Sequence, residues 1–249
     1  MSNPKVFVIG GITGGIGSAL ARRLKAQGHH VAGFARDAAA LEQLAQTEQV
    51  TTTVCDATDP EAIKQQLQTF AQEFGAIDGY VHAIGSIFLK PAHLTSPEDW
   101  MQTLNLNLSS AFYGLRAATQ LMSKQGTGSC LFFSTAAAQV GIANHEAIAA
   151  AKGGIEAMVR SAAASYSARG LRINAIAPSL TDTPLAKPII GSERALEFSK
   201  NMHPLGEIGN ADHVASLAAW LLSDEARFVT GQTYVVDGGI STILPKPKA

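Results

Sequence analysis

Short apolar runs alternate along this chain with longer segments of helical periodicity, and this alternation limits the folds that the chain can adopt. A continuous apolar run is typical of a strand that is buried on both faces, as in a parallel sheet covered by helices. The pattern therefore predicts a single-domain, doubly wound α/β fold. About seven strands are expected, at residues 5–9, 30–34, 50–55, 77–83, 129–134, 172–177 and 233–236.

Capping residues mark two helix starts, and one long connection stands out. Asp59 and Ser96 each directly precede a proline, so a side chain that accepts from backbone N–H groups stands before a residue that has no N–H. The stretch 179–209 is rich in Pro, Gly and Ser. It is long for a connection inside a compact domain, so we expect an irregular substrate lid within a single domain that spans 1–249.

Composition excludes several classes of partner. Nineteen Lys and Arg against 20 Asp and Glu give a net charge of -1, with no basic block to follow a phosphodiester backbone. No apolar stretch approaches the roughly 18 residues of a membrane span, and the first residues fit a strand better than a signal peptide. Two cysteines are too few for a disulfide framework. We therefore expect a cytoplasmic protein with no nucleic-acid or membrane partner and no metal site.

A glycine-rich turn follows the first expected strand and opens the first helix. Gly11, Gly15 and Gly17 have the spacing Gly-x-x-x-Gly-x-Gly. At such a turn the backbone N–H groups and the helix dipole face an anion, and the pyrophosphate of a dinucleotide is a suitable one. A turn of purely structural use is the alternative interpretation.

This turn and further motifs along nearly the whole chain resemble the short-chain dehydrogenase/reductase family, whose domain is a Rossmann fold. The further motifs are Asn174-Ala175-Ile176-Ala177-Pro178 followed by Thr183, Thr230-Gly231-Gln232, and Val236-Asp237-Gly238-Gly239. The resemblance implies an NAD(P)(H)-dependent oxidoreductase. It assigns cofactor binding to Gly11, Thr13, Gly15, Ile16, Gly17, Arg36, Asp56, Ala83, Gly85, Lys152, Pro178 and Thr183.

The residue after the second expected strand bears on the choice of cofactor. Arg36 stands where an arginine can pair with the 2′-phosphate of NADP, whereas an acidic residue would bind the ribose hydroxyls of NAD. NADP is therefore favoured, and the neighbouring Asp37 keeps NAD open. The resemblance places Asp56 against the adenine. A solvated arginine and a helix-capping carboxylate are the alternative interpretations of Arg36 and Asp56.

In the resembling enzymes Asn, Ser, Tyr and Lys cooperate, and the tyrosine exchanges a proton with the substrate oxygen. The resemblance assigns these catalytic places to Asn107, Thr135 and Lys152, with Thr135 in place of the serine. Ile148, four residues before Lys152, stands where the tyrosine is expected. An aliphatic side chain cannot transfer a proton, and losing a general acid typically costs about 10² to 10⁴ in rate. The alternative interpretation of Asn107 is that its side chain only forms a hydrogen bond with a nearby backbone group.

One substitute for the tyrosine is visible in the sequence. His145 lies seven residues before Lys152, the separation at which related enoyl-acyl-carrier-protein reductases place their tyrosine. Imidazole can donate a proton near neutral pH, although a histidine also occurs here as an ordinary loop residue. Lys152 itself or a relayed water are further candidate donors.

Two functions follow from these residues. The first is NADPH-linked reduction of a carbonyl or an activated alkene with a proton donor other than tyrosine. The alternative is a catalytically weak or inactive NADP(H)-binding subunit or regulator. Lys152 can bind the cofactor ribose in a protein that catalyses no reaction, so its presence is compatible with this alternative.

The resemblance also implies a homo-oligomer, a tetramer or a dimer, and a small-molecule substrate. Two departures from the family pattern are noted: His82 begins the segment that is usually Asn-Asn-Ala-Gly, and Ser179 replaces the glycine that follows the proline. Apolar residues in the expected lid favour an apolar substrate.

Overall fold

The computed structural model describes residues 3–245 and confirms the predicted doubly wound α/β fold. Seven parallel strands form one sheet in the order β3-β2-β1-β4-β5-β6-β9. Each predicted strand is present, and its ends differ from the prediction by at most two residues. The strands are β1 (Val6–Gly10), β2 (His30–Ala35), β3 (Thr51–Val54), β4 (Gly79–His82), β5 (Gly128–Phe133), β6 (Leu171–Pro178) and β9 (Thr233–Val236).

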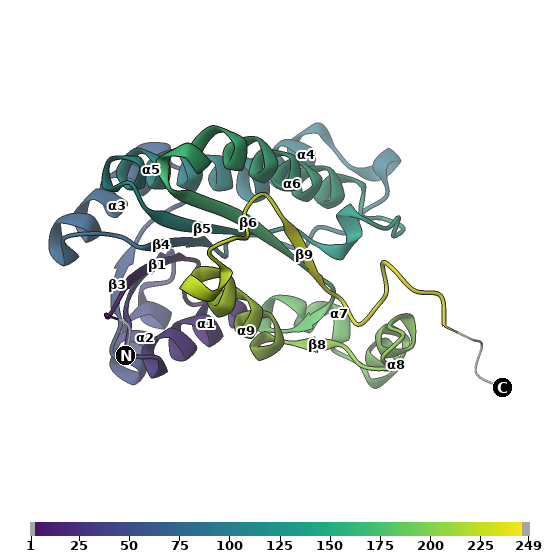
Figure 1. The fold of residues 1–249 in the computed structure, drawn as a ribbon. Coiled ribbons are helices and arrows are strands. Elements are labelled where there is room, and N and C mark those ends of the chain that lie inside the picture. Colours follow the sequence, from purple (N-terminus) through teal and green to yellow (C-terminus); the bar gives the residue numbers. More distant parts are fainter. Residues whose placement is uncertain (1–2, 246–249) are drawn as a thin grey trace.

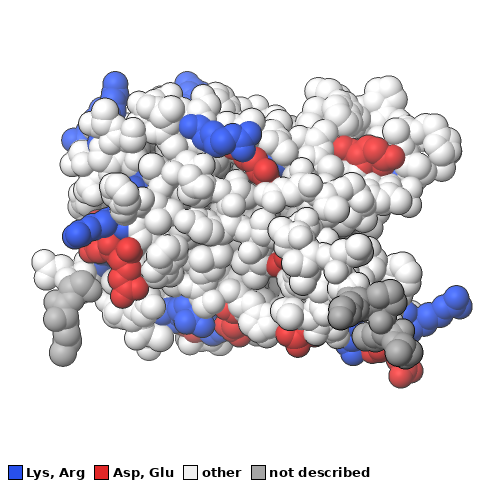
Figure 2. Space-filling model, turned by 45° about the vertical axis from the view of Figure 1, so that its right-hand side comes forward, with Lys and Arg blue, Asp and Glu red and all other residues white. Residues whose placement is uncertain are grey.

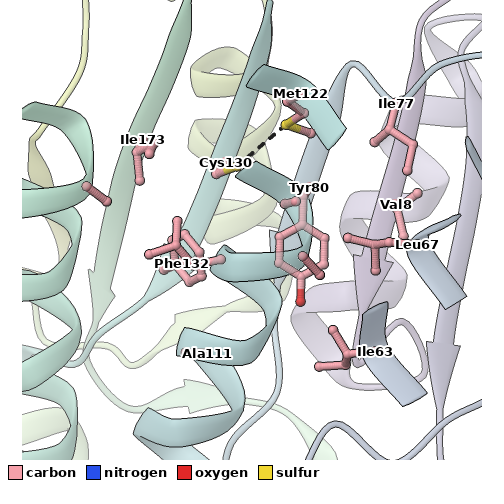
Figure 3. Packing of buried hydrophobic residues seen from close by; sticks show 14 of the residues in the cluster. Val8, Ile63, Leu67, Ile77, Tyr80, Ala111, Met122, Cys130, Phe132 and Ile173 are labelled. Atoms are coloured by element: carbon pink, nitrogen blue, oxygen red, sulfur yellow. Dashed lines mark hydrogen bonds between the residues drawn. The ribbon is translucent and has the colours of Figure 1, made fainter. Parts of the chain in front are cut away.

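Helices cover both faces of this sheet (Figure 1). One face carries α3 (Pro60–Phe74), α4 (Pro97–Leu104), α5 (Ser110–Gln125) and α6 (Glu146–Tyr166), and the other carries α1 (Gly15–Ala26), α2 (Ala38–Glu48) and α9 (Ala211–Leu222). Because side chains alternate along a strand, β1 sends Val8 into one core and Phe7 and Ile9 into the other. Figure 3 shows the first of these cores, in which Ile63 and Leu67 of α3 lie near the Tyr80 ring.

The predicted helix caps are present. The Asp59 carboxylate accepts hydrogen bonds from the backbone N–H groups at the start of α3, at 2.9 and 3.2 Å. The Ser96 hydroxyl accepts from the third residue of α4, Asp99, at 3.1 Å. Both cysteines, Cys55 and Cys130, are buried and free.

The strand order reverses beside β1, and this reversal marks one part of the carboxyl edge of the sheet. The chain passes from β1 to β2 and β3 on one side and then returns to β4 on the other side of β1. In open parallel sheets, ligands bind at this reversal, outside the carboxyl ends of the strands. The turns that follow β1 and β4 therefore border the candidate site.

The prediction that 179–209 is irregular is wrong in part. The segment forms the short strand β7 (Thr181–Asp182), which pairs with β8 (Gly209–Asn210), and the helices α7 (Lys187–Ile190) and α8 (Glu193–Met202). The Ser192 hydroxyl caps α8 by accepting from Ala195 N at 3.2 Å. The ten residues that follow this cap form the helix. The helix was not predicted because the segment as a whole is rich in Pro, Gly and Ser.

Charged side chains of both signs are spread over the face of the molecule that Figure 2 shows. Figure 2 shows a face on which Lys, Arg, Asp and Glu are scattered and most of the area is uncharged. Across residues 3–245, no helix is both long enough and apolar enough to pass through a bilayer. The same part of the chain contains no group of three or more His, Cys, Asp or Glu side chains arranged to hold a metal ion.

Candidate functional site

The turn after β1 is packed so closely that it requires glycine. Gly11 has φ +78°, and a Cβ atom on it would lie 2.6 Å from the carbonyl oxygen of Ala83. A Cβ atom on Gly15 would lie 2.6 Å from Cγ2 of Thr183. A Cβ atom on Gly17 would overlap the carbonyl oxygen of Gly11. The three glycines of the motif therefore allow the backbone to approach its neighbours.

The same turn leaves the start of α1 available to an anion. Gly14 is the N-cap of α1 and has no side chain to accept from the first backbone N–H groups, and the first turn contains no acidic residue. These N–H groups and the positive end of the helix dipole favour a negatively charged ligand. Thr183, at the start of the candidate lid, lies directly against this turn.

Arg36 and Asp56 follow neighbouring strands at the same edge of the sheet. Arg36 is exposed at the end of β2. Asp56 follows β3, and its Oδ1 accepts from Thr58 N at 2.9 Å and Thr58 Oγ1 at 2.8 Å. These two hydrogen bonds and the charge of Arg36 lower the pKa of Asp56. Asp37 accepts from Ala40 N at 3.0 Å and so caps α2.

Asn107 lies inside a π-helical turn between α4 and α5, at residues Asn105–Ser109. Its Oδ1 accepts from Ser86 N at 2.9 Å, and its Nδ2 donates to Ser86 Oγ at 3.0 Å and to Thr103 O at 3.0 Å. The side chain is fully buried, and these contacts fix both ends of its amide. The alternative of a local backbone hydrogen bond therefore describes only part of its environment, because two of the three partners belong to the loop after β4.

Lys152 is a buried cation on α6. Its Nζ donates to the carbonyl oxygen of Phe133, the last residue of β5, at 3.0 Å. Burial lowers the pKa of Lys152 from 10.5 to about 8, because water no longer solvates the ammonium group. The lysine therefore changes its charge in a range that is useful for proton transfer.

Gly85 brings Asn107 and Lys152 together. A Cβ atom on Gly85 would lie 2.8 Å from Asn107 Oδ1 and 3.2 Å from Lys152 Nζ. Both polar groups therefore border the same small space beneath the loop that follows β4. The close approach requires glycine at position 85, although its backbone is not in the left-handed region.

The paired hydroxyl residues after β5 have different roles. Ser134 Oγ lies 2.7 Å from Glu156 Oε1 and 3.2 Å from Lys152 O, so it ties β5 to α6. Thr135 Oγ1 accepts from Ala137 N at 3.3 Å, at the start of a 3₁₀ turn. The hydroxyl hydrogen of Thr135 remains available for another acceptor.

His145 and Ile148 lie on the first turn of α6 or just before it. His145 precedes the helix, and its Nδ1 contacts the carbonyl oxygen of Ala143 at 2.8 Å. Seven residues of α-helix correspond to about 10 Å, so the imidazole is two turns away from Lys152 along the helix axis. Ile148 is buried one turn before Lys152. The structure therefore brings Asn107 and Lys152 to the same space beside Gly85 and places His145 two turns before Lys152 along α6.

Two functional contacts were not predicted from the sequence. Ser86 holds the Asn107 amide with both its backbone N–H and its hydroxyl. Glu156 accepts from Ser134 and, at 3.2 Å, from Gln139 Nε2, which fastens the loop after β5 to α6. The position of Ser86 directly after Gly85 was the available signal, since that loop reaches the site. No sequence signal paired Glu156 with Ser134, because the contact joins separate elements.

A hollow elsewhere on the surface is not part of this site. It has a volume of about 350 Å³ and lies between α1 and α9. Arg22, Arg23 and Asp212 are among the residues that line it. It borders the second half of α1, away from the glycine turn and from Lys152.

Known proteins are similar to this chain over nearly all of its length. A family profile described as Enoyl-(Acyl carrier protein) reductase matches residues 11–241. The chain is 33% identical to cis-4-hydroxycyclohexanecarboxylate dehydrogenase of Sinomonas cyclohexanicum, over 96% of this chain and 97% of that protein. It is 30% identical to 3beta-hydroxysteroid dehydrogenase 1 of Eggerthella lenta, over 97% and 95%.

Solved structures agree with these sequence relatives. The fold is similar to that of a short-chain type dehydrogenase/reductase from Mycobacterium ulcerans, with a TM-score of 0.92 and 28% identity, over 97% of this chain and 91% of the other. It is also similar to levodione reductase, with a TM-score of 0.89 and 30% identity, over 96% and 98%.

The lowered pKa of Lys152 predicts a pH-dependent stability. Between about pH 8 and 10.5 the unfolded chain holds the lysine proton and the folded protein has released it, so stability rises with pH. Lys152→Met lacks this contribution. We expect the unfolding free energy of the wild type minus that of the variant to grow by about 3 kcal/mol across this range. Denaturant unfolding at a series of pH values measures it, and a constant difference would contradict the prediction.

Proposed function

Because the chain belongs to the short-chain dehydrogenase/reductase family, we propose that it reduces a carbonyl or an activated alkene with NADPH and a proton donor other than tyrosine. The nicotinamide, when bound, supplies the hydride. The observation that carries the proposal is the joint placement of Asn107 and the Lys152 ammonium beneath Gly85, at the carboxyl edge that also carries the glycine turn.

The residues at this edge fit a dinucleotide. The glycine turn is a cradle that a Cβ atom on Gly11 or Gly15 would fill, and the uncapped start of α1 supplies N–H groups to a pyrophosphate. Asp56 keeps a carboxylate oxygen free for the adenine. Lys152 would hold the ribose hydroxyls, and Thr183 would add a hydroxyl beside the turn. Thr13, Ile16, Ala83 and Pro178 complete the cofactor-binding set.

The contacts of Asp37, the acidic residue next to Arg36, support NADP over NAD as the cofactor. Asp37 is engaged in capping α2, so its carboxylate is less available to the ribose hydroxyls of NAD. Arg36 is exposed, and its guanidinium can form a bidentate pair with a phosphate. The 2′-phosphate of NADP is the group that distinguishes the two cofactors at this place.

Lys152 is the proton donor that the contacts favour, with His145 as the competing candidate. Ile148 stands at the tyrosine position of the family, so that position supplies no phenol. The pKa of Lys152 is lowered to about 8, so its ammonium group can give up a proton near neutral pH. Lys152 Nζ shares the space beneath Gly85 with Asn107, whereas His145 precedes α6 and lies two helical turns before Lys152.

Two other side chains orient the substrate oxygen and the lysine. Thr135 accepts from Ala137 N, so its hydroxyl hydrogen would be available to donate to the substrate oxygen. Asn107 lies beside the Lys152 ammonium and is held rigidly by Ser86 and Thr103. Hydrogen bonds that hold a side chain in one position maintain the geometry on which proton transfer depends.

The substrate is an apolar compound, which the lid covers. Phe198 of α8 and Leu185 before α7 are large apolar side chains that are more than half exposed. Apolar side chains that remain exposed around a site favour an apolar ligand. Two relatives are named for a hydroxysteroid and for hydroxycyclohexanecarboxylate, so ring-containing ketones and enones are the first substrates to test.

The protein acts as a homo-oligomer, a dimer or a tetramer. Phe228 is entirely exposed, and Phe112 on α5 is half exposed. Large apolar side chains on the surface of a monomer mark contact sites, and closed symmetric assemblies are the usual result.

The proposed activity predicts consumption of NADPH with a panel of ring-containing ketones and enones. Gly15→Val should abolish both NADPH binding and turnover, because its side chain would overlap Thr183. Gly141→Val is the matched control, since no atom lies within 4 Å of a Cβ placed there. Binding of NADPH without any turnover would favour the alternative of an inactive cofactor-binding subunit, and absence of NADPH binding would reject both functions.

The proposed cofactor preference predicts a selective effect at Arg36. Arg36→Ala should weaken NADPH binding roughly 10-fold or more, because a phosphate loses a charged partner that is worth about 1.5 to 3 kcal/mol. NADH binding should change little. Fluorescence titration with both cofactors measures the two constants. An equal loss for NADPH and NADH would show that Arg36 does not recognise the 2′-phosphate.

The proposed donor predicts the shape of the pH profile. The kcat for reduction should fall as pH rises through about 8, because Lys152 loses its proton there. Lys152→Arg keeps a cation for the ribose but holds its proton, so kcat should fall about 10²-fold or more while the Kd of NADPH is retained. His145→Gln should leave kcat nearly unchanged. A large loss in His145→Gln with little loss in Lys152→Arg would identify the histidine as the donor instead.

A further inference from the structure

Three polar side chains form a buried chain between β4 and α5, beneath the candidate site. The hydroxyl of Tyr80 lies 2.8 Å from His82 Nδ1, and His82 Nε2 lies 3.0 Å from Ser110 Oγ. The Ser110 hydroxyl in turn lies 2.6 Å from the carbonyl oxygen of Leu106. Each of the three polar residues is at most 1% exposed, so water does not take part in satisfying them.

The carbonyl at one end fixes the direction of every hydrogen bond in this chain. Leu106 O can only accept, so Ser110 donates its hydroxyl hydrogen there and must accept from His82 Nε2–H. His82 Nδ1 is then an acceptor, and Tyr80 donates to it. Burial, with a smaller contribution from the charge of Lys152, lowers the pKa of His82 to about 3, so the ring stays neutral and keeps this arrangement.

The chain ends at the backbone of the π-turn that carries Asn107. The N–H of Ser110 donates to Asn105 O, five residues earlier. In an α-helix that N–H would donate to Leu106 O, four residues earlier. The Ser110 hydroxyl replaces it at the Leu106 carbonyl, and it therefore stabilises the extra residue of the turn. Leu106 directly precedes Asn107, so this bond helps to fix the position of the Asn107 backbone, from which the side chain extends.

The opposite end of the chain is anchored in the apolar core. The ring of Tyr80 lies near Ile63 and Ala111, as Figure 3 shows. The hydroxyl end of this ring lies so close to Gly114 on α5 that a Cβ atom there would overlap it. The His82 ring also stacks on Phe132, with centroids 6.2 Å apart. Packing therefore holds the imidazole in one orientation.

We propose that His82 is a positioning residue, which acts through Ser110 to hold the π-turn and thereby keeps the Asn107 amide beside the Lys152 ammonium. His82 touches neither substrate nor cofactor. The kinetic consequence rests on the proposed function, whereas the effect on the position of Asn107 does not.

Removal of one buried hydroxyl tests the proposal against a closely matched control. Ser110→Ala breaks the bond to Leu106 O. Thr119→Ala removes another buried hydroxyl of α5, which donates to Leu115 O, four residues earlier, at 2.8 Å. We expect Ser110→Ala to lower kcat roughly 10- to 100-fold at unchanged NADPH Kd, because small misplacements at a catalytic group are costly. Thr119→Ala should lower the melting temperature with kcat retained.

A second substitution tests whether His82 acts through Ser110. His82→Leu should lower kcat to a similar extent, and the double variant His82→Leu/Ser110→Ala should be no slower than either single one, because the two residues act as one unit. Additive losses, or a kcat that follows the melting temperature equally in all variants including Thr119→Ala, would overturn the proposal.

A measurement without turnover separates this proposal from the proposed function. The side-chain amide resonance of Asn107, assigned with Asn107→Asp, should shift in Ser110→Ala and in His82→Leu and stay in place in Thr119→Ala. This outcome would support positioning even if no substrate is reduced. An Asn107 resonance that is unchanged in Ser110→Ala and His82→Leu would overturn positioning, whatever the activity of the wild type.

Discussion

Close backbone contact at the carboxyl edge of β1 and β4 is the constraint on which the rest of the site depends. Gly11 lies against the carbonyl of Ala83, so the turns after the two strands touch each other. Gly85, two residues after Ala83, lies against Asn107 and Lys152. One packing arrangement therefore sets the distance between the anion-binding turn and the polar groups of the site. A side chain at any of these glycines would move both together.

The buried charge of Lys152 shows that this region is organised for more than stability. A cation that is removed from water without a carboxylate partner is unfavourable, and the Phe133 carbonyl compensates for only part of the lost hydration. The lowered pKa of Lys152 reflects the unfavourable free energy of burying its positive charge. Burial, with a smaller contribution from the charge of Lys152, lowers the pKa of His82 to about 3, so a second positive charge does not develop there. A ligand that supplies polar groups to Lys152 would recover the missing solvation.

Local sequence signals were sufficient for the elements that depend on neighbouring residues. The strands follow from apolar runs, and the starts of α3 and α4 follow from Asp59 and Ser96, because each capping bond spans two or three residues. The glycine turn was equally clear. The π-turn at Asn107 could not be predicted, since it depends on the contact of Ser110 with His82, 28 residues away. The helix α8 was missed because composition was averaged over the whole of 179–209.

Among the site residues, too, some could be assigned from the sequence and others depend on contacts between distant parts of the chain. The resemblance assigned Asn107 and Lys152 to one site, and their shared proximity to Gly85 came only from the structure. Ser86 and Glu156 were not predicted, because each contacts a residue that is distant in the chain. The sequence offered His145 as a substitute donor, with Lys152 or a relayed water as further candidates. The structure places Lys152, and not His145, beside Asn107 beneath Gly85.

The departures from the family pattern are compensated within the chain, and this bears on whether the site has been lost or reorganised. His82, in place of the family asparagine, is matched by Ser110. Ser179, in place of the family glycine, donates to His203 Nε2 at 2.9 Å, and His203 Nδ1 contacts Ser199 O at 2.7 Å. Ile148 is apolar and buried, so it needs no polar partner.

A fold that had only lost its chemistry would leave buried polar groups without partners where its site had been. Within residues 3–245, the buried side-chain atoms that lack a hydrogen-bond partner are Arg23 Nε, Ser123 Oγ and Thr233 Oγ1. None of them lies in the π-turn, on α6 or in the turn after β4. The polar groups around Lys152 are satisfied in a pattern that uses the altered residues themselves, because His82 depends on Ser110 and Asn107 depends on Ser86. Such mutual satisfaction favours a reorganised active site over a decayed one.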